Sequence, residues 1–135
     1  MKLFRGLFQR KKVELAGAPA VRRMKTYSAE SGYVYQYFYE GYRPYTAGEE
    51  SGLEYVFSIS ADRKGWQDVT VLLGDEAMHT WEAAHERGLN STERYAVAKL
   101  ALFHAFDERA TPAQMKEAVR VRAADVDGII EQLGL

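Results

Sequence analysis

A chain of 135 residues is long enough to form one domain with its own hydrophobic core, and its lack of cysteine excludes disulfides, thiolate metal sites and a cysteine nucleophile. The net charge of −1 conceals an asymmetry, because residues 1–26 carry a net charge of +7 and residues 27–135 one of −8. An acidic folded part repels a phosphate backbone, so we expect no nucleic-acid partner.

The first residues, MKLFRGLFQRKK, combine apolar and basic side chains at helical spacing. This pattern is typical of a basic helix on an anionic membrane surface, and the alternative is a frayed terminus. Gly17 and Pro19 mark a linker, so we predict a flexible leader over residues 1–20 and a single domain over residues 21–135. The side chains expected to contact a membrane are Lys2, Leu3, Phe4, Arg5, Leu7 and Phe8.

No apolar run approaches the roughly 20 residues that span a bilayer. Charges also interrupt each apolar run near the N-terminus before the core of a signal peptide can form. We therefore expect a cytoplasmic protein whose only membrane contact would be through the leader.

Tyrosines alternate with other residues from residue 33 to residue 40, which predicts a β-strand because successive side chains of a strand point to opposite faces. One face carries Tyr33, Tyr35, Tyr37 and Tyr39. Because the other face carries the charge of Glu40, we expect the tyrosines to face the helices. In the alternative orientation, they would form an exposed aromatic surface with Val56, Trp66 or Leu72.

The rest of the first half predicts an antiparallel meander. Residues 24–28, 53–60 and 66–73 show strand patterns, and short turns favour pairing of neighbouring strands. Residues 41–52 are expected to be a loop because they contain Pro44 and several glycines.

The second half changes to helical periodicity. Helices are predicted over residues 75–87 and 90–109, another begins near Pro112, and residues 126–133 carry an apolar stripe. Residues 119–122 fit an edge strand. The expected fold is therefore α+β, with three to four antiparallel strands followed by three to four helices packed on one face. Because helix 90–109 is apolar on nearly all sides, it is either the central helix or the interface of a homodimer.

The sequence offers little for catalysis. Glu82 and His85 have the spacing of half a di-iron site, but the remaining helical histidine, His104, has no glutamate three residues before it. The pair fits a solvated helix face, and His104 fits a core histidine better than a general base. There is no G-x-S-x-G motif and no phosphate-binding loop, so we expect no catalytic residues, no metal and no cofactor.

Three functions follow from these features. The first is a non-enzymatic module that binds a protein partner or a second copy of itself. The second is a small-ligand protein or enzyme with a pocket between sheet and helices. The side chains expected at that binding site are Tyr33, Tyr35, Tyr37, Tyr39, Trp81 and His104. The third is peripheral membrane association through the leader.

Overall fold

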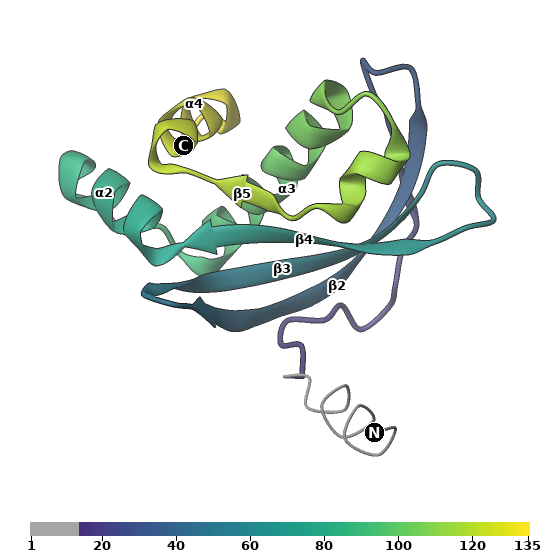
Figure 1. Cartoon of the computed structure of the whole chain (residues 1–135). Helices are drawn as coiled ribbons and strands as arrows, with labels where there is room; N and C mark the ends of the chain where they lie inside the picture. Colours follow the sequence, from purple (N-terminus) through teal and green to yellow (C-terminus); the bar gives the residue numbers. More distant parts are fainter. Residues whose placement is uncertain (1–13) are drawn as a thin grey trace.

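A computed structural model describes residues 14–135, in which helices cover one face of a five-stranded sheet (Figure 1). The strands are β1 (Lys25–Ser28), β2 (Val34–Ala47), β3 (Glu50–Ser60), β4 (Gln67–Gly74) and β5 (Val119–Val121). The helices are α2 (Asp75–His85), α3 (Ser91–Glu108) and α4 (Ala123–Leu133), with a 3₁₀ turn η1 (Pro112–Lys116). No helix within these residues is long and apolar enough to cross a bilayer.

The strands follow the order β1-β2-β3-β4-β5, and the first four pair antiparallel. The predicted α+β class is confirmed, and so is an edge strand after the third helical segment. The predicted number and direction of the strands need correction, because residues 14–135 form five strands and β5 runs parallel to β4. Parallel pairing needs a long crossover, which α2, α3 and η1 supply here.

The core lies between the sheet and the helices. Tyr35 and Tyr37 of β2 point into it, and Phe106 of α3 stacks on Tyr35 with ring centroids 4.1 Å apart. The expectation that these tyrosines face the helices therefore agrees with the structure. The other fully buried side chains of the core include Phe57, Ile59, Val69, Val71, Leu73, Met78, Val97, Leu102, Met115 and Val126.

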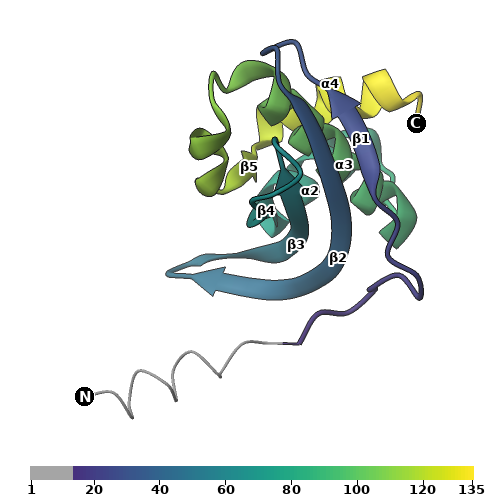
Figure 2. The ribbon, with the colours of Figure 1, turned by 90° about the vertical axis from the view of Figure 1, so that its right-hand side faces the viewer.

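The β2–β3 hairpin is longer than expected and strongly curled (Figure 2). The loop predicted over residues 41–52 is wrong, because the strands stay paired as far as Ala47 and Glu50. Pro44 is tolerated inside β2 because β1 pairs only as far as Tyr37, so that a missing N–H at residue 44 breaks no ladder on the β1 side.

A β-bulge interrupts β2 between Tyr39 and Gly41. Gly41 has a φ of +131°, and a Cβ there would lie 2.6 Å from the carbonyl oxygen of Ala16. Ala16 forms a backbone bridge with Tyr42 at the same point. Residues 14–17, which fall in the predicted leader, therefore pack against the bulge, and only glycine allows this close approach.

Helix α3 lies at the centre of the helical layer. Its Phe103 stacks on Tyr27 of β1 with centroids 4.2 Å apart, and its first turns contact β2 and β3 through Tyr95. Both α4 and β5 also pack against it. The apolar circumference that pointed to either a central helix or a dimer interface is thus in contact with neighbouring elements of the same chain.

Asp107, near the end of α3, holds the turn between β1 and β2. Its carboxylate accepts hydrogen bonds from the Tyr27 hydroxyl at 2.8 Å and the Glu30 amide at 2.9 Å. Ser31 donates to the carbonyl oxygen of Phe106 at 2.8 Å. The sheet is therefore attached to α3 at the β1 edge as well as through the core.

The face of the sheet away from the helices carries a small exposed cluster. Phe38 lies between Trp66, 5.3 Å away by ring centroids, and the guanidinium of Arg22, which also pairs with Glu40. Trp66 is 40% exposed, whereas Val56 and Leu72, which the alternative orientation placed on an exposed aromatic surface, are buried.

Candidate functional site

A cleft of about 540 Å³ opens where the curled part of the sheet meets the start of α3. Four of its lining side chains are tyrosines, and no histidine, aspartate or glutamate lines it. We refer to it as the tyrosine cleft. Its lining residues are Gly17, Tyr39, Tyr42, Leu53, Tyr55, Leu89, Ser91, Thr92, Arg94 and Tyr95.

The β-bulge brings Tyr39 and Tyr42 into the same cleft. Three residues apart, they would lie on opposite faces of a regular strand. The extra residue at the bulge shifts the alternation, so Tyr39 pairs opposite Phe57 and Tyr42 opposite Tyr55, which share the inner face of β3.

The four rings form a continuous aromatic wall. Tyr95 of α3 lies 4.6 Å from Tyr39 and 6.5 Å from Tyr55 by ring centroids, and Tyr42 lies 5.7 Å from Tyr55. All three pairs are tilted rather than stacked face to face, an arrangement that aromatic quadrupoles favour.

The hydroxyls of these four tyrosines have no hydrogen-bond partner among residues 14–135. By contrast, the hydroxyls of Tyr27 and Tyr45 donate to carboxylates. Tyr55 is only 2% exposed as a residue, but its hydroxyl is not among the buried polar atoms that lack a partner, as that of Tyr35 is, so it opens to the cleft and is available to a ligand.

Burial keeps the cleft phenols protonated. It raises the pKa of Tyr55 to about 12, although the positive charge of Arg94 acts in the opposite direction. Burial also raises the pKa of Tyr39 and of Tyr95. Near neutral pH these three groups are therefore neutral hydrogen-bond donors, and none is a base.

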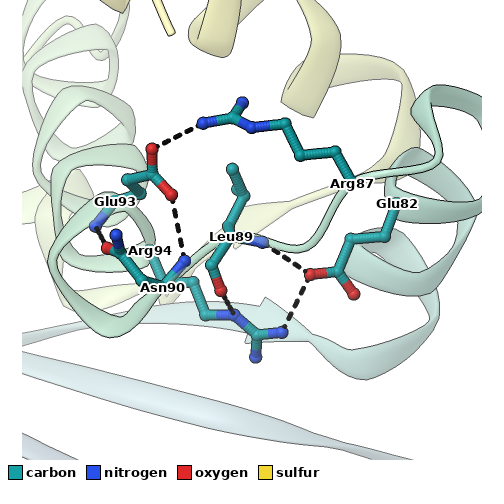
Figure 3. Close-up of polar contacts among 6 residues, drawn as sticks. All are labelled: Glu82, Arg87, Leu89, Asn90, Glu93 and Arg94. Carbon is teal, nitrogen blue, oxygen red and sulfur yellow. Dashed lines mark hydrogen bonds and ion pairs between the residues drawn. The ribbon is translucent and has the colours of Figure 1, made fainter.

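Arg94 is fixed in place by the connection between α2 and α3 (Figure 3). Its Nε donates to the carbonyl oxygen of Leu89 and its Nη2 to Glu82, both at 3.2 Å. Glu82 also accepts the amide of Leu89 at 2.9 Å, and this bond, followed by Arg94, lowers the pKa of the Glu82 carboxyl. Glu82 thus fixes both the connection and the guanidinium that borders the cleft.

The start of α3 is defined by a capping box, which is also drawn in Figure 3. The side chain of Asn90 accepts the amide of Glu93 at 2.8 Å, and Glu93 accepts the amide of Asn90 at 3.0 Å. Ser91 and Thr92 of the first turn then line the cleft. The partial positive charge of a helix N-terminus therefore adds to that of Arg94.

The six predicted binding residues do not form one site. Tyr39 lines the cleft, Tyr35 and Tyr37 lie in the core, and Tyr33 is 37% exposed outside it. Trp81 is a buried residue of α2, and its indole N–H donates to Asp127 of α4 at 3.3 Å.

His104 lies far along α3 from the cleft. It is half-buried, and its Nε2 is 3.1 Å from Oε1 of Gln132. The six side chains expected at a membrane surface, from Lys2 to Phe8, lie outside the described residues.

The residues that sequence reasoning missed are Tyr42, Tyr55, Tyr95 and Arg94. They come from three elements, and Tyr42 joins the cleft only through the bulge, for which Gly41 is the single signal in the sequence. Tyr95 was expected only as part of an apolar helix face.

Glu82 and His85, the pair with the spacing of half a di-iron site, make contacts within the protein. Glu82 binds Arg94, and the ring of His85 stacks on Trp81 with centroids 4.3 Å apart. Within residues 14–135, no group of three or more histidine and acidic side chains is placed to hold a metal ion.

Comparison with known proteins gives no match. No protein-family model, no curated protein and no solved structure is significantly similar to this chain.

Proposed function

We propose that this chain is a non-enzymatic binding protein whose tyrosine cleft takes a small organic acid, with an apolar or aromatic body against the rings and its acidic group beside Arg94. The size of the cleft, about 540 Å³, is in the range of small-molecule sites. This proposal develops the pocket between sheet and helices that the sequence suggests.

The observation that carries the proposal is the hydroxyl of Tyr55. It belongs to a residue that lines the cleft, it has no partner among residues 14–135, and it lies close enough to Arg94 for the arginine charge to lower its pKa against the effect of burial. A phenol hydroxyl that no side chain engages is a free donor, and a ligand oxygen would accept its hydrogen bond.

Arg94 supplies the preference for an acid. A guanidinium has five N–H donors, and Leu89 and Glu82 occupy one each. The remaining donors suit a carboxylate or phosphate oxygen, which the start of α3 also favours. An organic cation would suit the four rings but would be repelled by Arg94.

The lining supports binding rather than catalysis. Proton transfer near neutral pH needs a group such as a histidine or a perturbed carboxyl, and the cleft has neither. Its buried phenols hold their protons more firmly than free tyrosine does.

Isothermal titration with benzoate, phenylacetate and 1-naphthoate tests the proposal, with the corresponding amides as uncharged controls. We expect the acids to bind and the amides to bind about tenfold more weakly, because a hydrogen bond to a charged group contributes about 1.5–3 kcal/mol. Arg94→Gln should remove this difference.

Tyr55→Phe removes only the hydroxyl and should weaken acid binding, while Tyr33→Phe, outside the cleft, is the matched control. Equal affinity for acids and amides would refute the role of Arg94. Unchanged affinity in Tyr55→Phe would show that the ligand sits elsewhere.

A further inference from the structure

A second and larger hollow lies at the other end of α3. It has a volume of about 840 Å³, and α3 and α4 form its walls. Its floor is formed by β5 and the residues on either side of it, Ala118 and Arg122. We refer to it as the β5 groove, and it shares no lining residue with the tyrosine cleft.

The floor of the groove is the outer edge of the sheet. In the described chain, β5 pairs with β4 on one side only. Along a parallel strand, backbone N–H and C=O groups point alternately to the two sides. The side of β5 away from β4 therefore presents backbone hydrogen-bonding groups that no strand among residues 14–135 uses.

Small residues keep the groove wide. Ala101 and Ala105 line it from α3 beside His104 and Glu108, and Gly128 lines it from α4. Gly128 lies inside a helix, where glycine is unfavourable, and a Cβ there would meet nothing within 4 Å. Close packing therefore does not require this glycine, and its effect is to leave the groove open.

Arg109 fixes the chain that enters β5. Its Nη1 donates to the carbonyl oxygens of Gln114 at 2.9 Å and Glu117 at 2.7 Å, and its Nη2 to that of Ala118 at 3.2 Å. These bonds hold the edge in position without a partner strand. A preordered edge lowers the entropy cost of binding.

We infer that the β5 groove binds an extended, uncharged segment of a partner protein, which adds a sixth strand beside β5. The backbone groups of the edge provide the hydrogen bonds, and the small side chains leave room for alternate side chains of the added strand. Because β5 spans three residues, the added strand would have about three to five residues and extend about 10–17 Å.

The charge of the groove favours an uncharged segment. Its lining contains three arginines and three carboxylates, and two of the arginines are already engaged, Arg109 on backbone carbonyls and Arg120 on Glu50. Neither sign of charge on a peptide would gain a consistent attraction.

Selection of a displayed random heptapeptide library against the full chain tests this inference. Enriched peptides are then synthesised and measured by titration against the wild type, Gly128→Trp, which fills the groove, and Gly128→Ala, which leaves most of it open. We expect affinity to fall about tenfold or more in Gly128→Trp and to change less than about twofold in Gly128→Ala. Circular dichroism establishes that both variants fold.

Hydrogen exchange provides the second readout. A bound peptide should slow hydrogen exchange of the β5 backbone amides that point away from β4. N-methylation of the peptide should abolish binding when it removes an amide that faces β5 and should leave binding intact when it removes an amide on the opposite edge of the peptide.

Peptides that bind wild type and Gly128→Trp equally would overturn the inference, as would a selection without enrichment. A concentration-dependent dimer that Gly128→Trp dissociates would assign the groove to a second copy of this chain instead. Arg94→Gln, in the tyrosine cleft, should leave peptide binding unchanged.

Discussion

The two ends of α3 support two different kinds of surface. At its start, Tyr95 and Arg94 join three tyrosines of the sheet, so large side chains with polar tips form the tyrosine cleft. Towards its end, the small side chains of Ala101 and Ala105 leave space in the β5 groove, and the backbone of β5 forms its floor. One helix thus borders a site made of side chains and a site made of main chain.

This difference predicts different responses to substitution. The tyrosine cleft depends on particular atoms, such as the Tyr55 hydroxyl, so replacing single polar groups should change its affinity. The β5 groove depends on space and on an ordered edge, so it should tolerate most substitutions of exposed side chains and fail when it is filled. Substitutions and a change of pH can test that contrast.

Truncation of the shared support should damage both sites. Phe106 is fully buried in α3 and stacks on Tyr35, so Phe106→Ala should lower the free energy of unfolding by about 3–5 kcal/mol in a urea titration. Leu135→Ala, at a residue that is 45% exposed, should cost under about 0.5 kcal/mol. A loss below about 1 kcal/mol for Phe106→Ala would show that α3 is not a common support.

High pH should destabilise the side of the molecule that is rich in tyrosine. Burial raises the pKa of Tyr37 and of Tyr55 to about 12, whereas an unfolded tyrosine titrates near 10. The unfolded chain therefore loses these protons first, so the stability they contribute is complete below about pH 10 and is lost as the pH rises towards 12.

Phenolate absorbance and circular dichroism, followed together, measure this effect. Late ionisation should coincide with unfolding, and Tyr55→Phe should make the alkaline decline in stability shallower. If all tyrosines ionised near pH 10 in a protein that stayed folded, the buried state of Tyr37 and Tyr55 would be contradicted.

Loss of the carboxylate at residue 82 should lower the stability of the chain and raise its affinity for benzoate. Glu82→Gln removes the ion pair with Arg94 and weakens the bond to the Leu89 amide, which should cost about 1–2 kcal/mol of stability. The same change removes an anion that competes for Arg94, so benzoate should bind more tightly. Glu86→Gln, at an exposed residue on the same connection, is the control. Weaker benzoate binding would indicate that Glu82 matters mainly as the support of the cleft.

The glycine inside α4 and the glycine that caps its C-terminus should respond to substitution in opposite directions. Gly128→Ala should stabilise the chain by about 1 kcal/mol, because a Cβ fits there and alanine favours the helix. Gly134→Ala should destabilise it by a similar amount, because residue 134 ends the helix with a φ of +74°. Thermal unfolding measures both, and destabilisation by Gly128→Ala would mean that the groove wall is packed.

Local patterns in the sequence predicted most elements of the fold. Alternation placed Tyr35 and Tyr37 on one face, and the apolar stripe over residues 126–133 located α4. The hairpin over residues 41–52 was missed because proline and glycine usually mark loops. Pro44 nevertheless lies within β2, in the part of that strand that does not pair with β1. Gly52 is needed in β3 because a Cβ there would collide with the carbonyl oxygen of Leu73.

The tyrosine cleft could not be predicted from the same patterns. Its side chains come from segments that meet only in three dimensions, and a one-residue bulge decides that Tyr42 faces Tyr55. Periodicity also cannot distinguish Tyr95 from Ala101, because it identifies both simply as apolar residues of one helix. In the structure, the ring of Tyr95 forms part of the cleft wall, whereas the small side chain of Ala101 leaves space in the β5 groove.

The hydrogen bonds that attach the β1–β2 turn to Asp107 and Phe106 at the end of α3 also bear on the order in which this chain folds. Its bonds to Tyr27 and Glu30 join residues 80 and 77 positions apart, and the bond from Ser31 to Phe106 spans 75. During synthesis, β1 and its turn leave the ribosome long before α3 exists to receive them. The first strand can pair with β2 across a short turn, but its attachment to α3 has to close a long loop, and closing loops of this length slows folding. We expect the β1 edge to be the last part of the sheet to become protected, and the part most exposed to aggregation in the unfinished chain.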